Sequence, residues 1–446
     1  MKKTLCIVLA VLMIVGLFSG CAREKEPLRI CVDLDYVSWS QYHAADAMKI
    51  FLSRVKDLGG PEDVVLDVIP ESGVERDTAI TRLRTEIMAG EGPDLFIMAC
   101  DDGTSWKAEA LFPIPEKAME NGMFLSLDPY IEDEKFAQWD KLMPQVMAAG
   151  RDEYGQQIVP IAYAIPLTFY LESDVPEKPG VETAWQEMLE DKTDVLTAAA
   201  SWYHTKALTL ESEQDDHIEY ALGELADYEN EELLFTEEEL LQRVREILEL
   251  KKQWTPDMPP DVPVHYQTRV GISYDGFGSY SQTYADNVDP FNGIRPEDPK
   301  TMIPIYSDDG GTTVTITHFA AISSNTRRPE DAFFILDVLM GMDSQQYSDL
   351  YGDWFLMRNS LPMHTDLLSA EYPTRHMGTW YFAGDNFEEF CRVRDQITYA
   401  SFSGALHVML KEMFWMIDLA EWDESSQTTE EIVSEYYRKM EQILKE

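Results

Sequence analysis

Aromatic rings and carboxylates occur together in several stretches that follow apolar segments of the sequence. An aromatic ring can pack against the C–H face of a sugar ring, and Asp, Glu, Asn or Arg side chains can hydrogen-bond its hydroxyl groups. These residue types are the ones that a site for a small hydroxyl-rich solute requires. The candidates are Tyr36, Trp39, Asp101, Asp102, Trp106, Tyr163, Tyr274, Asp275, Phe277, Trp354, Arg358 and Trp380.

Each candidate also has an ordinary structural explanation. A single aromatic residue is commonly packed in a core or an interface, and Asp101 and Asp102 could instead cap the N-terminus of a helix. Tyr274 and Phe277 lie in a glycine-rich stretch, where a ligand can approach the backbone because side chains are missing. As a set, these stretches favour a binding site more than any single residue does.

Other kinds of chemistry find little support in the sequence. The eight histidines show no HxH or HExxH spacing, so we expect no metal site and no other cofactor. Gly276-x-Gly278 lacks the lysine that follows in a phosphate-binding loop, and no Gly-x-Ser-x-Gly nucleophile elbow is present. We therefore expect no enzyme, although a carboxylate pair for glycan hydrolysis stays possible among 81 Asp and Glu residues.

The balance of charge excludes some partners. The chain of 446 residues carries 81 acidic and 36 basic side chains, a formal net charge of −45. Such a field repels the phosphates of DNA and RNA as well as anionic lipid headgroups. We therefore expect no nucleic-acid partner and no membrane contact through the folded surface.

The N-terminus has the pattern of a secretory signal peptide. A short basic start precedes the apolar run 5–18, which is shorter than the roughly 20 residues of a membrane span. Residues 17–21 resemble the bacterial lipobox, with Phe18 where Leu is usual. We predict that 1–20 is removed and that Cys21 is lipidated. The mature chain is then anchored to the cell membrane by lipid alone, on its extracellular or periplasmic face.

Three cysteines remain in the mature chain, Cys31, Cys100 and Cys391. An odd count without a CxxC motif argues against a disulfide framework and a zinc site. Cys31 and Cys100 each lie in a predicted buried strand, where cysteine behaves as a small hydrophobic residue. A bridge between these two stays possible if their strands are neighbours.

The elements that must position the candidate residues alternate between strand and helix. We predict strands over 28–34, 64–69 and 95–100. A helix over 44–56 separates the first two, and a helix that carries Ile80, Ile87 and Met88 and ends at Gly90 separates the last two. Continuous apolar strands with helices between them indicate a parallel sheet covered on both faces, and so an α/β fold.

Later elements continue this pattern without a linker between independent halves. We predict extended chain over 155–170 and strands over 270–274 and 312–322. The stretch 184–254 is predicted to be mostly helical, with a capping box at Thr236 and Glu239. A further helix is capped by Asn325 and ends at Gly341, and a C-terminal helix begins at a second capping box, Thr428 and Glu431.

Three short motifs occur in order along the chain. Arg84–Asp94 ends in Gly-Pro-Asp, Gly155–Pro160 reads Gly-Gln-Gln-Ile-Val-Pro, and Ala321–Asn325 is followed by Pro329–Ala332. Together they resemble the helix–turn–strand, first crossing strand and returning strand of bacterial extracellular solute-binding proteins, family 1, the sugar-binding type. Ile158 stands where that family usually has Tyr, and a Trp that usually follows Ala-Met-x-x-x-Gly is absent.

The resemblance implies a two-lobed periplasmic-binding-protein-like fold of type II, with interleaved lobes joined by crossing strands. By analogy, lobe one comprises 21–163 and 313–358, and lobe two comprises 164–312 and 359–446. A small solute, in first place an oligosaccharide, would bind in the cleft as a monomeric protein closes. It would then pass to the permease subunits of an ABC transporter.

Two alternatives stay open at this point. The chain could be a secreted glycan-degrading enzyme, which would consume a glycan where a binding protein returns it intact. It could also be a sensor on the same scaffold without a role in transport. The sequence does not select the solute or the type of cell envelope.

Overall fold

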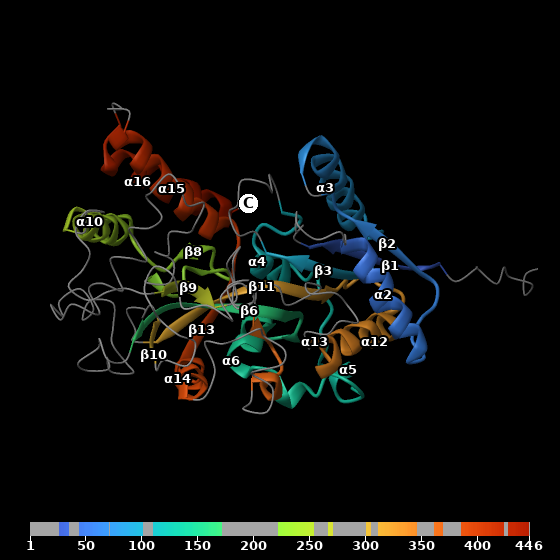
Figure 1. Ribbon diagram of the computed structural model, residues 1–446. Coiled ribbons are helices and arrows are strands. Elements are labelled where there is room, and N and C mark those ends of the chain that lie inside the picture. Colours follow the sequence, from blue (N-terminus) through green and yellow to red (C-terminus); the bar gives the residue numbers. More distant parts are fainter. Residues whose placement is uncertain are drawn as a thin grey trace, which may run out of the picture.

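The structure is a computed structural model, and its helices and strands form a mixed α/β fold (Figure 1). It describes residues 26–34, 44–70, 72–100, 110–171, 222–253, 266–270, 300–304, 311–345, 361–368, 385–422 and 427–445. The predicted α/β class is confirmed.

The N-terminal part alternates strand and helix as expected. Its elements are β1 (Leu28–Asp33), α2 (Ala44–Asp57), β2 (Val64–Val68), α3 (Gly73–Met88) and β3 (Leu95–Ala99). β1 pairs in parallel with both β2 and β3. β3 is buried along its whole length, as its continuous apolar sequence predicts. Met88 differs from the expectation, because it lies 85% exposed in the last position of α3.

Two long strands connect the N-terminal part to the rest of the fold. They are β6 (Ile158–Leu171) and β11 (Thr312–Ile322), and they lie side by side in the order β10-β6-β11-β3-β1-β2. β11 is antiparallel to β3, so the sheet is mixed and not purely parallel as predicted.

Both long strands change partners along their length. β6 pairs first with β11 and then with β9 (Tyr266–Val270) and β10 (Lys300–Pro304). β11 pairs first in parallel with β13 (Ile397–Phe402), and then with β3 and β6. In Figure 1 the two strands run from the blue N-terminal elements toward the side that holds β9, β10 and β13. They are therefore the crossing strands of the fold.

The remaining elements are mostly short, apart from the long helices of the C-terminal part. They are α4 (Pro115–Glu120), α5 (Asp128–Ile131), η1 (Trp139–Lys141), α6 (Pro144–Met147), η2 (Ala148–Gly150), β4 (Arg151–Asp152), β5 (Gly155–Gln156), β7 (Ala226–Asp227), β8 (Glu232–Leu233), α10 (Glu237–Gln253), α12 (Pro329–Met340), α13 (Met342–Gln345), β12 (Leu361–Pro362), η5 (Thr365–Leu368), α14 (Asp385–Arg394), α15 (Ala405–Trp422) and α16 (Thr429–Leu444).

Helix starts and stops follow the sequence signals closely, with two exceptions. Both predicted capping boxes form, before α10 and before α16, and α12 ends at Gly341. The β7–β8 hairpin interrupts a stretch that we predicted to be mostly helical. The N-cap of α12 is Arg328 instead of Asn325, because Pro329 suits the first helical position, where no N–H is needed.

The apolar side chains of the described residues form two cores. The first contains the strands of the large sheet and the inner faces of α2, α3 and α12. The second is built mainly from α10, α15 and α16, with Val244, Leu410 and Ile432 among its buried residues. Leu361 and Met363 lie in the first core, although the analogy places them in lobe two. The lobe boundaries themselves stay predictions.

The described cysteines are free thiols. Cys31 and Cys100 are both buried, in keeping with their interpretation as small hydrophobic residues. β1 and β3 are neighbours, but Cys31 lies opposite Phe96 and not opposite Cys100. Within the described part of the chain, no helix is both long and apolar enough to cross a membrane. The predicted signal peptide and Cys21 lie outside the described residues.

Candidate functional site

Two stretches that carry candidate residues begin at the same edge of the sheet. β1 and β3 run parallel, and Asp33 at the end of β1 lies opposite Met98 near the end of β3. The segment that contains Tyr36 and Trp39 follows β1, and the segment that contains Asp101 follows β3. The last residues of β1 and β3 before these segments therefore lie at a common edge of the sheet.

Tyr163 of β6 lies at this same edge. His318 of β11 is opposite Ala99 on one side and opposite Ala162 on the other. Tyr163 is therefore level with Cys100, the last residue before the second of these segments. Adjacent strands are spaced by about 4.8 Å, so the two positions are about 10 Å apart across β11. This is also the point at which β6 leaves β11 and begins to pair with β9.

The side chain of Tyr163 is packed inside the first core. Its relative exposure is 0%, and its hydroxyl has no hydrogen-bond partner among the residues that the structure describes. Burial raises the pKa of Tyr163 well above its usual range, so the group is a neutral phenol. In this conformation Tyr163 is thus a core residue, which agrees with the ordinary structural explanation of a single aromatic residue as part of a core. Its hydroxyl is a buried polar atom whose hydrogen bond is unmade.

The other candidates lie outside the described residues, and their part in binding stays a prediction. They are Tyr36, Trp39, Asp101, Asp102, Trp106, Tyr274, Asp275, Phe277, Trp354, Arg358 and Trp380.

Sequence analysis missed a buried ion pair at this edge. Arg76 of α3 donates from Nη1 to Asp33 Oδ1 at 2.9 Å and from Nη2 to Asp33 Oδ2 at 2.8 Å. It also donates to the carbonyl oxygen of Pro70 at 3.1 Å. The side chains of the pair are 0% and 4% exposed. This bidentate contact fixes the ends of β1 and β2 against α3.

One signal in the sequence could have indicated the buried position of Arg76. Arg76, Ile80 and Leu83 recur at helical spacing and form the buried face of α3. An arginine on an apolar helix face requires a buried partner, because an unpaired buried charge is very costly. Asp33 is 43 residues away along the chain, so no local spacing identifies it as that partner.

Asp94, the last residue of the Gly-Pro-Asp motif, braces the opposite edge of the sheet. Its carboxylate accepts hydrogen bonds from the backbone N–H of Arg29 at 2.9 Å and from Thr326 Oγ1 at 2.6 Å. Its own carbonyl oxygen accepts a hydrogen bond from the N–H of Ser323. The motif therefore joins the start of β1, the start of β3 and the chain after β11.

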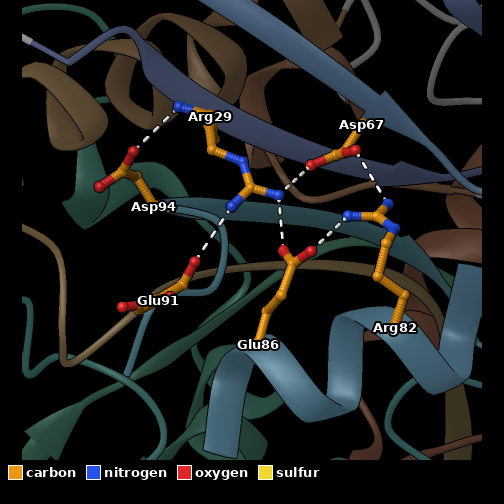
Figure 2. Close-up of polar contacts among 6 residues, drawn as sticks. All are labelled: Arg29, Asp67, Arg82, Glu86, Glu91 and Asp94. Carbon is orange, nitrogen blue, oxygen red and sulfur yellow. Dashed lines mark hydrogen bonds and ion pairs between the residues drawn. The ribbon is translucent and has the colours of Figure 1, made fainter. Parts of the chain in front are cut away.

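Four charged side chains beside Asp94 form a closed set of ion pairs (Figure 2). Arg29 contacts Asp67 and Glu86, and Arg82 contacts the same two carboxylates at 3.0 and 2.8 Å. Burial by itself would raise the pKa of Glu86, but hydrogen bonds from Arg29 and Arg82 outweigh it and lower the pKa. Because these side chains are partly exposed, each pair stabilises the fold only modestly.

Replacing Asp94 with alanine should lower the free energy of unfolding by about 2 kcal/mol, since two hydrogen bonds to a carboxylate are lost. Urea denaturation of the mature protein measures the change. Glu91→Ala is the matched control, because Glu91 is exposed and contributes only its carbonyl oxygen to Arg29. Equal losses in the two variants would contradict the bracing role of Asp94.

Two further features of the described residues identify no ligand. A surface hollow of about 540 Å³ runs along α3, and the side chains that line it all belong to that helix, including Thr78, Thr81 and Arg82. No group of three His, Cys, Asp or Glu side chains in the described part is placed to hold a metal ion.

Comparisons with known proteins show the fold. No protein-family model matches the sequence, and no curated protein matches it. The sugar-binding protein MalE from Xanthomonas citri is 12% identical with a TM-score of 0.53, over 94% of this chain and 97% of that one. The cyclic alpha-maltosyl-1,6-maltose binding protein from Arthrobacter globiformis is 13% identical with a TM-score of 0.51, over 94% and 99% of the two chains.

A further similar structure bears the name of the family that the motifs resemble. It is an extracellular solute-binding protein family 1 from Alicyclobacillus acidocaldarius, 13% identical with a TM-score of 0.50, over 94% of this chain and 98% of that one. The chain therefore has the fold of the two-lobed periplasmic solute-binding proteins, and the predicted resemblance is confirmed at that level. A de novo designed cysteine esterase, 12% identical with a TM-score of 0.51 over 94% and 98% of the chains, is also similar. Fold alone thus does not separate binding from catalysis.

Proposed function

We propose that this chain is an extracellular solute-binding protein that captures a small hydroxyl-rich solute, in first place an oligosaccharide, for an ABC importer. One observation carries the proposal: β1 and β3, the strands that precede two of the candidate segments, end at the same edge of the sheet as Tyr163 of β6. Ligands of α/β proteins bind outside the carboxyl ends of strands, and pockets form preferentially between domains. Sugar binding in two proteins of the same fold supports the choice of solute.

In this proposal the two lobes supply complementary groups. Tyr36 and Trp39 would pack against the C–H faces of the sugar, and Asp101 and Asp102 would accept hydrogen bonds from its hydroxyls. The other residues proposed to contact the solute are Trp106, Tyr274, Asp275, Phe277, Trp354, Arg358 and Trp380. The hydroxyl of Tyr163, which has no partner in the described part of the chain, would gain a hydrogen bond when the lobes rearrange around the solute.

The proposed location follows from the N-terminal sequence. Removal of 1–20 and lipidation of Cys21 would anchor the protein to the membrane, with the folded part outside the cytoplasm. There it would meet its solute and the permease subunits of the transporter. The strongly negative net charge keeps the folded part away from anionic headgroups.

A thermal-shift screen of the mature protein, from Ala22 onward, should reveal the solute. Oligosaccharides, monosaccharides, polyols and peptides form the panel. A bound solute at 100 times its dissociation constant stabilises the fold by about 2.7 kcal/mol, which gives a clear rise in Tm. We expect a saturable rise with at least one oligosaccharide, which is then recovered intact.

Matched variants sharpen this screen. Trp39→Ala should weaken binding of the same oligosaccharide about tenfold, a loss of about 1.4 kcal/mol. Trp415→Ala should leave binding unchanged, because Trp415 lies 60% exposed on α15, in the second-core part of the fold. The absence of any shift across the panel would overturn the carbohydrate assignment, and degradation of the sugar would instead favour a glycan-degrading enzyme.

A further inference from the structure

The strand β2 forms one end of the large sheet. In the order β10-β6-β11-β3-β1-β2 it comes last, and among the described residues it pairs only with β1. The side of β2 that faces away from β1 is therefore a free strand edge. Such an edge presents backbone N–H and C=O groups to which a further strand can bind.

The hydrogen bonds at the two ends of β2 show which of its backbone groups face the free edge. The carbonyl oxygen of Asp63 accepts a hydrogen bond from β1 at 2.8 Å, and the N–H of Ile69 donates to β1 at 2.9 Å. The register between these two hydrogen bonds is continuous. Because successive residues of a strand turn their backbone groups to opposite sides, every second residue between them faces away from β1. The free-edge residues are Val64, Leu66 and Val68.

Within the described part of the chain, this edge lacks the usual protections against pairing. Native sheets guard a free edge with an exposed Lys, a Pro or a bulge. β2 reads Val-Val-Leu-Asp-Val and has no bulge. Its one charged residue, Asp67, is held in ion pairs by Arg29 and Arg82 (Figure 2). Val65 and Val68 are 46% and 39% exposed, so β2 presents apolar side chains together with its backbone groups.

The charge beside the edge selects the kind of occupant. Glu62, which precedes β2, pairs with Lys56 at 3.0 Å, and the arginines of Figure 2 are balanced by two carboxylates. Glu75 and Asp77, both exposed in the first turns of α3, add negative charge at the end where β2 leads into that helix. A strand with Lys or Arg is therefore attracted. A second copy of this chain, with its formal net charge of −45, is repelled.

We propose that the free edge of β2 is a docking site for an extended basic segment of another protein, which joins the sheet as a further strand. The segment is extended because only a strand matches the spacing of alternate backbone groups along the edge. Its β-branched residues pack beside the exposed valines of β2, and its Lys or Arg residues face the acidic start of α3. Docking at this edge involves no solute, so it does not depend on the proposed function.

Fluorescence anisotropy of a probe peptide measures docking to the mature wild-type protein. The probe reads Lys-Val-Thr-Val-Thr-Lys and carries a neutral fluorophore at its N-terminus. We expect saturable binding. A probe with all its backbone N–H groups methylated cannot donate to the edge, and a probe with Glu in place of both Lys is repelled by the acidic start of α3. Each should bind at least about tenfold more weakly, because hydrogen bonds or charge attraction are lost.

Two variants locate the docking at β2. Val68→Pro removes a donor of the free edge but none of the hydrogen bonds to β1, since Pro is tolerated on an edge strand where its nitrogen faces solvent. It should keep the urea midpoint of the wild type and bind the probe about tenfold more weakly. Val68→Thr keeps the donor and the shape of the side chain, so it should bind the probe as the wild type does.

Four results would overturn the proposal. They are no binding of the probe, equal binding of the methylated probe, equal binding by Val68→Pro, and self-association of the mature protein that Val68→Pro abolishes, which would make a second copy the occupant. The methylated probe is tested on the wild-type protein, so it decides the matter even if Val68→Pro fails to fold.

Discussion

Replacing Arg76 with methionine should lower the free energy of unfolding by about 3 to 5 kcal/mol, because it leaves the buried carboxylate of Asp33 without its partner. Methionine fills a similar volume, so a cavity contributes little to the loss. Urea denaturation of the mature protein gives the change from the midpoint and the slope. The same substitution at Arg82, which is 45% exposed and makes only surface ion pairs, should cost less than about 1 kcal/mol.

A double variant tests whether the loss arises from the unpaired charge. In Arg76→Met with Asp33→Asn no buried charge remains, so we expect much of the lost stability to return. A double variant no more stable than Arg76→Met would contradict this explanation. Asp33 ends β1 just before the stretch that contains Tyr36 and Trp39. The pair is therefore also expected to support the sheet edge of the proposed solute site.

The elements of the N-terminal part could be predicted because their signals are local. β3 is a continuous apolar run, β1 and β2 are mostly apolar, and both capping boxes lie within four residues. The Gly-Pro-Asp motif was also found, but its function in the structure is to brace the sheet through Asp94. A motif that identifies a fold thus need not contact the ligand.

Features that depend on distant parts of the chain could not be predicted from such signals. The antiparallel insertion of β11 between β3 and β6 joins residues more than 150 positions apart. Nothing local marks Asp33 as the partner of Arg76. Tyr163 was predicted at the crossing of β6, but aromatic character alone does not indicate that its ring is buried.

The stability of the protein should fall as the pH rises from about 4.5 to about 7, because the carboxyl of Glu116 in α4, which is 8% exposed, releases its proton near pH 4.5 in the unfolded chain but only near pH 7 in the folded protein. The pKa of this carboxyl is higher in the folded than in the unfolded protein, so the folded state binds more protons in this interval. Its contribution is therefore complete below pH 4.5 and is lost as the pH approaches 7. The difference between the two pKa values corresponds to about 3 kcal/mol at pH 8.

Comparison with Glu116→Gln isolates this contribution from the repulsion among the other acids, which changes with pH in both proteins. Near pH 4.5 the two proteins should have similar free energies of unfolding, because the carboxyl of Glu116 is then protonated in the folded state. At pH 8 the variant should be more stable than the wild type by about 3 kcal/mol, since its buried amide carries no charge. A buried acid with a lowered pKa would give the opposite order at pH 8, with the wild type more stable. The sign of that difference therefore decides whether burial or hydrogen bonding dominates at Glu116.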